Sequence, residues 1–407
     1  MKYDGIVIGG GPAGMFAAII AAQQGQKVLL LERGDRLGKK LLITGKGRCN
    51  VTNDCDVREV LKNIPRNGRF LYSALSACPP EDVKQFFEER GCPLKTERGN
   101  RVFPVSDRSA SVLDALRKAM SVAKVTVAYE KRVTDLLIQD NQVIGVAVGR
   151  EKINSNWVLL ATGGKSYPTT GSTGDGYALA ERVGHKIIPP VGSLVPLDAE
   201  DDCALMQGLS LRNVGVRLVD PCGKLLYSDF GELLFTHFGV SGPTVLSASA
   251  HIIGNGCKLL IDLKPGLDDA KLNDRILRDL QMYRNRSMEN ALTDLLPRSM
   301  IPVVLKRLDI DPAMQANALN KQKRRSMVEL IKSFPVTIKG KRPVEEAIIT
   351  SGGIDVTQIA PKTMESKLVK GLYFAGEVID CDAYTGGFNL QIAWATAFAA
   401  AMAASEA

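Results

Sequence analysis

Residues 3–14 read YDGIVIGGGPAG, and this stretch decides the fold. Within it Gly9, Gly11 and Gly14 have the GxGxxG spacing of dinucleotide-binding turns. The first glycine permits the tight turn, the second lets the backbone approach a diphosphate, and the third lets helix and strand pack closely. Diphosphate oxygens then meet free N–H groups and about half a positive charge at the start of the following helix. The stretch therefore predicts a dinucleotide site.

The segments around this turn have the periodicity that such a site requires. Residues 3–8 and 28–31 are short apolar runs, and residues 12–24 fit a helix between them. Right-handed crossover packing makes the two strands parallel neighbours. Glu32 ends the second strand, where its carboxylate can accept hydrogen bonds from both hydroxyls of an adenosine ribose and disfavours a 2′-phosphate. The alternative is an empty structural turn, but strand, turn, helix and acid in register favour the site.

FAD and NAD share their AMP half, so the choice between them depends on the other end of the chain. Residues 371–377, GLYFAGE, indicate a buried strand that runs into a Gly-Glu turn. The helix that follows is entered through Gly386 and Gly387, and its positive N-terminus points at whatever lies in front of it. Facing a flavin, this helix end stabilises the negative charge that builds up on reduction. We therefore predict FAD, against the alternative of a plain Ala-rich helix packed on the sheet.

At 407 residues the chain is too long for one hydrophobic core, because such cores stop growing at roughly 250–300 residues. Short β runs from about 122 to 162, VAKVTVAY among them, predict a β-meander that returns to the main sheet. Residues 191–262 are mostly β-like, which indicates a separate β domain. Residues 266–333 carry helical spacing and caps, which predicts a small helical subdomain nested in that insert.

Positive charge is concentrated in the helical stretch. Residues 264–342 hold 17 Lys and Arg against 9 Asp and Glu, and this excess of eight equals the net charge of the whole chain, +8. A basic face can attract RNA or an anionic cofactor tail, yet Lys and Arg on small helices usually form only a solvated surface. We therefore do not expect nucleic acid as a partner, and RNA binding is kept as the less favoured alternative.

The composition, 45% hydrophobic and 24% charged, is that of an ordinary soluble protein. The longest apolar stretch, residues 392–404, is shorter than the roughly 20 residues that span a membrane. The 8 cysteines form no CxxC pair and the 3 histidines have no metal-ligand spacing, so we expect no metal. These features predict a cytoplasmic protein with reduced thiols, monomeric or homodimeric, without membrane contact.

Longer blocks of the sequence resemble a known family. The most specific is ERGDRLGKKLLITGKGRCNVTN at residues 32–53, and others lie at 100–110, 159–185 and 231–243 and in the C-terminal segment. Together they look like the NAD(P)/FAD-dependent oxidoreductases of the BaiN and aminoacetone oxidase type, a group of bacterial flavoproteins. ATGG followed by TGDGYALA is also similar to the fumarate reductase and ketosteroid dehydrogenase superfamily.

The resemblance implies an α/β fold, with a Rossmann-like FAD-binding domain built from both chain ends and an inserted β-barrel domain that carries the small helical subdomain. This organisation agrees with the segmentation read from the residues. We expect the FAD-binding domain at residues 1–190 and 343–407, the barrel domain at 191–265 and 334–342, and the helical subdomain at 266–333.

The resemblance also implies the cofactor contacts. The first glycine turn would lie at the diphosphate, Glu32 at the ribose, Arg33 beside the adenine, and Val133 would pair its backbone with the adenine edge. The residues after 375 would surround the ribityl chain and the flavin ring. The expected FAD-binding residues are Gly9, Gly11, Ala13, Gly14, Glu32, Arg33, Lys40, Arg48, Asn50, Val133, Thr162, Gly163, Gly376, Glu377, Gly387, Asn389 and Leu390.

The catalytic proton donor is sought in the two family blocks that FAD does not need. His237 is attractive because the unperturbed pKa of histidine lies near 6.5, although a histidine hydrogen-bonded within a barrel loop is the favoured alternative. Cys49 lies beside Arg48, which would favour a thiolate, but a packing role is favoured for it. The catalytic candidates are His237, Tyr167 and Thr236, with Ser172, Thr173 and Ser241 beside them.

Three functions remain in view. The leading hypothesis is an NADH- or NADPH-dependent reductase of an activated C=C bond in a small enone or steroid-like substrate, motivated by the resemblance. It is weakened because the sequence holds no second GxGxxG for a nicotinamide domain. The alternatives are an oxidase of a small amine such as aminoacetone, which forms hydrogen peroxide, and a flavoprotein that binds RNA through the basic helical insert.

Overall fold

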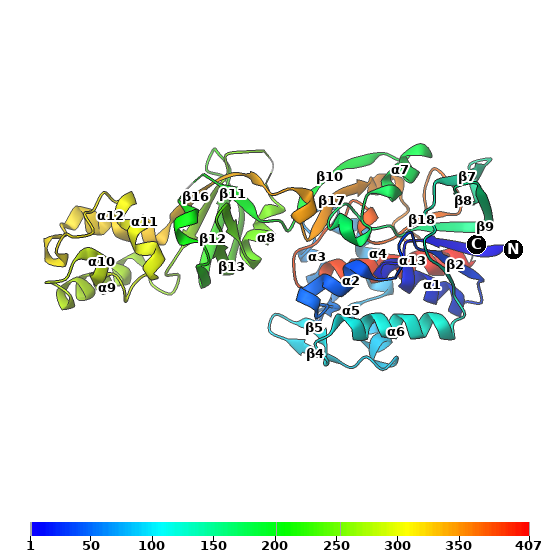
Figure 1. The fold of residues 1–407 in the computed structure, drawn as a ribbon, viewed down its shortest axis with the longest axis horizontal. Coiled ribbons are helices and arrows are strands. Elements are labelled where there is room, and N and C mark those ends of the chain that lie inside the picture. The colour runs from blue at the N-terminus through cyan, green and yellow to red at the C-terminus, as the bar shows by residue number, and fades with distance from the viewer. Residues whose placement is uncertain (1, 201, 253, 407) are drawn as a thin grey trace. The chain divides into compact units, whose positions relative to one another are not determined.

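The computed structural model of the chain describes residues 2–200, 202–252 and 254–406. The chain divides into two compact units, Met1–Ser193 with Val344–Ala407, and Leu194–Pro343. Each unit has its own cluster of buried apolar side chains. Both ends of the chain therefore belong to the first unit (Figure 1).

The first unit is built on a mainly parallel sheet with the strand order β6-β2-β1-β9-β8-β7, and β18 pairs with β9. Its centre is apolar, since Ile6 of β1 lies opposite both Leu29 of β2 and Val158 of β9. β18 comes from the far end of the chain and runs parallel to β9. The strands are β1 (Tyr3–Ile8), β2 (Val28–Leu31), β6 (Thr126–Ala128), β7 (Asp135–Gln139), β8 (Gln142–Val148), β9 (Glu151–Leu160) and β18 (Leu372–Phe374).

Helices α1 and α13 pack together in the core of this unit. Both are rich in alanine and largely buried, so their small side chains allow close packing. Trp394 of α13 is the large exception, and its ring contacts those of Phe16 and Phe87. The helices of the unit are α1 (Pro12–Gln23), α2 (Lys39–Ile43), α3 (Val57–Lys62), α4 (Tyr72–Ala77), α5 (Pro80–Glu88), α6 (Ser109–Val122), α7 (Asp175–Arg182) and α13 (Phe388–Glu406).

One predicted strand belongs to a different part of the sheet. The run VAKVTVAY was assigned to the β-meander, but α6 continues to Val122, and β6 pairs in parallel with β2, with Thr126 opposite Leu29. The prediction was wrong because a strand preceded by a packed helix joins the parallel sheet by a crossover, whatever its local apolar pattern. The antiparallel meander consists of β7, β8 and β9.

Two strands join the two chain segments of the first unit. β10 (Ile187–Ser193) ends the first segment and pairs antiparallel with β17 (Ile349–Ile354), with Ser193 opposite Ile349. Every residue of β17 is buried. A small antiparallel sheet, formed by β3 (Thr52–Asn53), β5 (Arg101–Pro104) and β4 (Leu94–Glu97), completes the unit.

The second unit contains a closed barrel with the strand order β11-β14-β13-β12-β15-β16. Fully buried Phe235 and Phe334 contribute to its core. The predicted α/β class with an inserted barrel and helices is confirmed. The strands are β11 (Leu197–Ala199), β12 (Ser210–Val219), β13 (Leu225–Phe235), β14 (Gly239–Ser241), β15 (Lys258–Asp262) and β16 (Phe334–Lys341), and α8 (Pro243–Ser249) follows β14.

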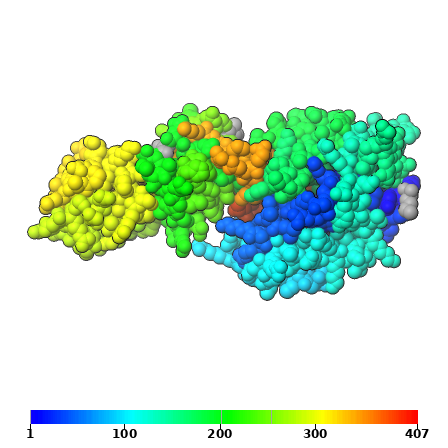
Figure 2. Space-filling view, in the orientation of Figure 1, coloured from blue at the N-terminus to red at the C-terminus, as the bar shows by residue number. Residues whose placement is uncertain are grey.

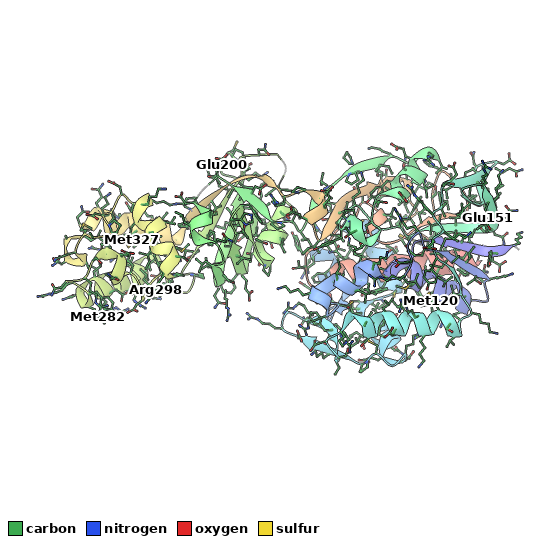
Figure 3. All side chains as sticks on the ribbon, in the orientation of Figure 1. Met120, Glu151, Glu200, Met282, Arg298 and Met327 are labelled. Carbon is green, nitrogen blue, oxygen red and sulfur yellow. The ribbon has the colours of Figure 1, made fainter. Side chains whose placement is uncertain are left out.

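Between β15 and β16 the chain forms a group of helices, drawn in yellow and yellow-green in Figure 2. They share one apolar core with the barrel. Met327, labelled in Figure 3, is fully buried in that core, whereas Met282 at the end of α9 is exposed. The helices are α9 (Asp269–Met282), α10 (Met288–Ala291), α11 (Ile301–Arg307) and α12 (Lys321–Lys332).

Candidate functional site

A pocket opens in the first unit where β1, β2, β9 and β18 end, which is the edge at which parallel sheets bind ligands. Its walls come from both chain ends, namely the glycine turn after β1 and the residues that precede and begin α13. The pocket encloses about 1330 Å³ of empty space, open solvent included. The lining includes the glycine turn and Glu32, which the sequence predicts for a dinucleotide.

The glycines of the first turn differ in what a side chain would meet. Gly9 has a φ of +109°, and a Cβ there would lie 2.5 Å from the carbonyl oxygen of Ala161. A Cβ on Gly14 would lie 1.9 Å from the carbonyl oxygen of Gly9. Around Gly11, by contrast, no described atom lies within 4 Å of the Cβ position. The protein itself therefore does not require glycine at position 11, and a diphosphate lying against the turn would occupy this open space.

The start of α1 has the features of an anion site. Pro12 occupies its first turn, and no side chain among the described residues caps the helix. The free N–H groups of that turn line the pocket with Gly11 and Ala13. A diphosphate placed there would satisfy them and gain from the helix dipole.

Glu32 is held in the pocket wall by two backbone donors. Its Oε2 accepts from the N–H of Gly10 at 2.8 Å, and its Oε1 accepts from the N–H of Gly34 at 2.7 Å. Each carboxylate oxygen has a further lone pair, so both remain able to accept from a ribose hydroxyl. The geometry agrees with the role predicted for this residue.

A buried hydroxyl in the pocket also lacks a partner. Thr162 lines the pocket, and its Oγ1 makes no hydrogen bond within the described part of the chain. Gly176 allows α7 to approach, since a Cβ there would lie 2.0 Å from this oxygen. Because buried hydroxyls are almost always hydrogen-bonded, the orphan points to a missing polar ligand. The glycine turn, Glu32 and Thr162 together fit FAD.

At the Glu32 end of the pocket, Asp175 joins two arginines. Its carboxylate accepts from Arg33 Nη1 at 3.0 Å and from Arg132 Nε at 2.9 Å, and Arg33 also bonds Thr173. Burial acts to raise the pKa of Asp175, but the hydrogen bond from Arg132 and the charge of Arg33 outweigh it, so the pKa is lowered. The carboxylate is therefore charged and closes one end of the pocket with its arginine partners.

Farther along the pocket, Lys40 forms a buried ion pair with Glu377. Lys40 Nζ lies 2.6 Å from Glu377 Oε2 and 2.6 Å from Ser166 Oγ. Glu377 Oε1 accepts from Ser166 Oγ at 2.9 Å and from the N–H of Thr350 at 2.8 Å. Their side chains are only 19% and 12% exposed. These hydrogen bonds hold together four parts of the chain, around residues 40, 166, 350 and 377, at one ion pair.

The entry to α13 is fixed by glycines and by Asn389. Gly387 has a φ of +97°, and a Cβ there would lie 2.3 Å from the carbonyl oxygen of Thr52. Asn389 accepts from the N–H of Ala383 at 2.9 Å and donates to its carbonyl oxygen at 2.7 Å. Asn389 and Leu390 line the pocket, so the first turn of α13 forms part of its wall.

Most of the predicted cofactor residues meet in this pocket, while a few lie outside its lining. Gly14 lies behind the turn, and Arg48, Asn50 and Gly387 do not line the pocket. Arg48 instead pairs with carboxylates and stacks on the Phe103 ring at 4.1 Å. The predicted residues that do line it are Gly9, Gly11, Ala13, Glu32, Arg33, Lys40, Val133, Thr162, Gly163, Gly376, Glu377, Asn389 and Leu390.

The predicted catalytic candidates lie in different units. Tyr167 belongs to the first unit, is half-buried and has a φ of +52°. Thr236 and His237 belong to the turn between β13 and β14 of the second unit. Thr236 Oγ1 accepts from the N–H of Gly239 at 3.1 Å, which makes it part of the turn, and His237 is exposed. Their catalytic roles stay predictions.

Cys49 is fully buried, and burial raises the pKa of its thiol to about 12. A hydrogen bond involving Thr44 opposes this shift only in part. The side chain is therefore a neutral thiol at physiological pH, which agrees with the packing role favoured for it.

The sequence analysis missed a polar cluster beside β17. Asp380 and Asp382 are buried, and Asn67 Nδ2 donates to Asp380 Oδ2 at 3.1 Å. Ser193 Oγ donates to Asp382 Oδ2 at 2.7 Å, and Arg66 Nη2 lies 3.6 Å from Asp380 Oδ1. Burial raises the pKa of Asp380 and the charge of Asp382 adds to this, while Arg66 and Asn67 oppose it. No motif signals this cluster, because long-range packing assembles it.

A metal-ion site and a membrane-spanning helix are both absent from the described residues. Among them, no group of three or more His, Cys, Asp or Glu side chains is placed to hold a metal ion. No described helix is both long enough and apolar enough to cross a membrane.

Comparison with known proteins shows similarity along the whole chain. A family model described as HI0933-like protein Rossmann domain matches residues 3–403. The chain is 31% identical over 408 residues to the 3-dehydro-bile acid delta(4,6)-reductase of Clostridium scindens, covering 98% of each chain. It is also 31% identical over 410 residues to the ribosomal RNA dihydrouridine synthase of Haemophilus influenzae, covering 99% of this chain and 98% of that relative.

Among solved structures, the chain is similar to the 3-ketosteroid delta1-dehydrogenase of Sterolibacterium denitrificans in complex with 1,4-androstadiene-3,17-dione. The TM-score is 0.53 at 13% sequence identity, and the match covers 100% of this chain and 99% of that one. At this identity the likeness concerns the fold.

Proposed function

This chain belongs to the HI0933-like family and is a FAD-dependent oxidoreductase, and from that premise we propose that it reduces a C=C bond conjugated to a carbonyl. The names of the two relatives support the proposal. One acts on the Δ4 and Δ6 bonds of a 3-dehydro bile acid, and the other forms dihydrouridine, which differs from uridine by reduction of the C5–C6 bond. All three bonds are conjugated to a carbonyl group, the Δ6 bond by way of Δ4, so by their names both relatives catalyse the same class of reaction.

The observation that carries the cofactor assignment is the single pocket in which the glycine turn, Glu32 and the unpartnered hydroxyl of Thr162 meet. We assign the glycine turn and the start of α1 to the FAD diphosphate, and Glu32 to the adenosine ribose. Val133 would meet the adenine through its backbone. Bound there, FAD supplies the hydride equivalent that the reduction needs.

The protein's own residues have three tasks in this reaction. The Lys40–Glu377 pair holds four chain segments in place around the middle of the pocket. The N-terminus of α13, whose first turn lines the pocket, would stabilise negative charge on the reduced ring. The reaction also needs a group that delivers a proton to the α-carbon of the substrate. Of the predicted candidates, Tyr167, Ser172 and Thr173 belong to the same unit as the pocket, and Ser172 lines it.

The first candidate substrate is a small enone or steroid-like molecule, with NADH or NADPH as the electron donor. The test is anaerobic stopped-flow mixing of the FAD-loaded protein with each nucleotide, followed by androst-4-ene-3,17-dione or cyclohex-2-enone. Bleaching of the flavin by a nucleotide and its recovery on enone addition support the proposal. A flavin reduced by dithionite that no enone reoxidises contradicts the small-molecule assignment.

The second candidate substrate is uridine within RNA. It is favoured because the chain is as similar to the dihydrouridine synthase as to the bile acid reductase, over the same length. The test is incubation of the reduced protein with transcribed ribosomal RNA and mass analysis of its nucleosides. Dihydrouridine in the product supports this candidate, and its absence with active enone turnover rejects it. An amine oxidase stays a prediction from the sequence resemblance, because neither relative is named as one.

A further inference from the structure

The concentrated positive charge of residues 264–342 is not used by the pocket, which lies wholly in the first unit. Many of these side chains are already paired within the second unit. Arg275 bonds Asp279, Lys323 lies near Asp309, and Lys332 pairs with Asp262. The basic groups that are available to bind a partner are therefore the smaller set that forms no ion pair with a described carboxylate of this unit.

Hydrogen bonds bring several of these groups together along α9 and α12. Arg324 Nε of α12 donates to Asn273 Oδ1 of α9 at 3.1 Å. After α9, the carbonyl oxygen of Arg284 accepts from the N–H of Asn317 at 3.3 Å, only a few residues before α12 begins. The carbonyl oxygen of Arg286 accepts from the N–H of Ala316 at 2.9 Å. The end of α9 thus lies beside the start of α12, and the two helices run antiparallel.

This arrangement gathers Lys321 and Arg325 on one side of α12, one turn apart, with Arg284 and Arg286 near the start of the same helix. Lys321, Arg325, Arg284 and Arg286 are exposed, and Arg324 is half-buried. Within the described part of the chain, no carboxylate lies within 4.0 Å of any of these five. We call Arg284, Arg286, Lys321, Arg324 and Arg325 the α9–α12 basic surface.

Exposed Glu329 lies one turn beyond Arg325 on α12 but forms no ion pair with it, and two other nearby acids are engaged elsewhere. Asp279 is buried and bonded to Arg275, and Asp294 accepts from the hydroxyl of Tyr283. The ring of Tyr283 in turn lies 4.7 Å from the guanidinium of Arg286, which gives the surface an aromatic neighbour. Exposed arginines beside an aromatic ring suit a phosphate backbone with accessible bases, since arginine binds phosphate by two parallel hydrogen bonds.

We propose that the α9–α12 basic surface binds the phosphodiester backbone of the RNA whose uridine the flavin site reduces. The inference rests on the second candidate function and adds to it where the RNA is held. Backbone contacts of this kind position a nucleic acid without reading its sequence, so selection of the uridine is left to the site itself. The surface predicts binding that weakens steeply with salt, because each phosphate contact releases condensed counterions.

The experiment measures binding of the oxidised, FAD-loaded protein to a fluorescein-labelled RNA hairpin with a uridine-rich loop, by anisotropy over a range of salt concentrations. The test variant is Lys321→Ala/Arg325→Ala. Its matched control, Arg117→Ala/Lys118→Ala, removes the same charge from the exposed face of α6 in the first unit. Flavin absorbance and the thermal midpoint of each variant verify that it is folded.

We expect the test variant to bind the hairpin roughly tenfold more weakly, with the salt slope reduced by about two, and the control to bind like the parent. Equal losses in both variants would assign the effect to net charge and overturn the surface. So would a parent protein that does not bind RNA at low salt, or one whose RNA binding does not weaken as salt is raised. RNA binding without dihydrouridine formation would retain the surface and reject the second candidate function instead.

Discussion

Gly11 and Gly14 are three residues apart and serve different purposes. A side chain on Gly14 would collide with the carbonyl oxygen of Gly9, so its absence lets α1 pack against β1. A side chain on Gly11 would meet only open space within the described protein. Glycine at position 14 is therefore required by the fold, whereas we expect glycine at position 11 to be required by a ligand against the turn.

Gly11→Ala is expected to leave the stability of the apoprotein unchanged, because Gly11 has a φ of −79° that alanine adopts readily. It should weaken FAD binding by about tenfold or more, since the methyl group occupies the space of the diphosphate. Gly14→Ala is expected to lower the free energy of unfolding by roughly 1–3 kcal/mol through overpacking. FAD titration and urea unfolding of both apoproteins measure the contrast. Unchanged FAD affinity in Gly11→Ala would show that the cofactor does not touch this turn.

Asp380 offers a prediction about pH. Burial first, and then the charge of Asp382, raise its pKa above the ordinary value of 3.8, against the opposing effects of Arg66 and Asn67. A carboxyl whose pKa is raised by folding supports the folded state at low pH, and this support is lost as the pH rises through the folded-state pKa. Asp380→Asn cannot ionise. Its free energy of unfolding, relative to the parent, is therefore expected to increase between about pH 4 and pH 7.

Urea unfolding at a series of pH values measures this difference. Asp4→Asn is a suitable control, because Asp4 lies at the start of β1, away from the cluster, and its carboxylate accepts from the backbone N–H of Lys27. A pH-independent difference for Asp380→Asn would show that this carboxyl is ionised throughout the range.

At the scale of the element, the parts that the sequence predicts well are those governed by local rules. The boundaries of β1, α1 and β2 follow from apolar periodicity and one glycine spacing, and the structure confirms them within one residue. The role of Glu32 is predictable for the same reason, because this residue stands at the end of the second strand. The partners of Glu377 could not be predicted, because Ser166 and Thr350 are 211 and 27 residues away from it and no shared motif joins them. β6 was misassigned for the same reason, since its partner strand is not its neighbour in sequence.

The packing of α13 depends strongly on one large side chain, although the helix is rich in alanine. Trp394 is fully buried, contacts two aromatic rings and donates its indole N–H to the carbonyl oxygen of Val51 at 2.9 Å. Trp394→Ala is expected to lower the free energy of unfolding by about 3–5 kcal/mol, because it leaves a large cavity and an unpaired carbonyl. Trp394→Phe should recover part of this loss. Urea unfolding compares the two variants. Similar free energies of unfolding for Trp394→Ala and Trp394→Phe would mean that the lost hydrogen bond matters more than the lost packing.

At the scale of the whole molecule, function and stability are distributed unequally between the units. The pocket and both chain ends belong to the first unit, whereas the second has its own core of barrel and helical side chains. The sequence predicted this division from the change in periodicity after the proline pair at 189 and 190. How much each unit needs the other is a thermodynamic question.

Calorimetry of the protein with and without FAD should reveal two unfolding transitions. FAD should raise the midpoint temperature of only one of them. FAD at one hundred times its dissociation constant should stabilise the first unit by about 2.7 kcal/mol, because it binds the folded state alone. The transition of the second unit should not move. A single transition that shifts as a whole would show instead that the two units unfold together.

The pairing of β10 with β17 has a consequence for how such a molecule arose. Ser193, where the chain leaves the first unit, lies opposite Ile349, shortly after the chain returns. A whole module can be inserted between two residues that are neighbours in the folded host. The strands of the host then still pair, because bringing the two ends together costs little additional loop-closure entropy. An insertion at this point leaves the lining of the cofactor pocket, which lies wholly in the first unit, unchanged. By the same geometry, a short hairpin in place of Leu194–Pro343 would connect β10 directly to the chain that leads into β17.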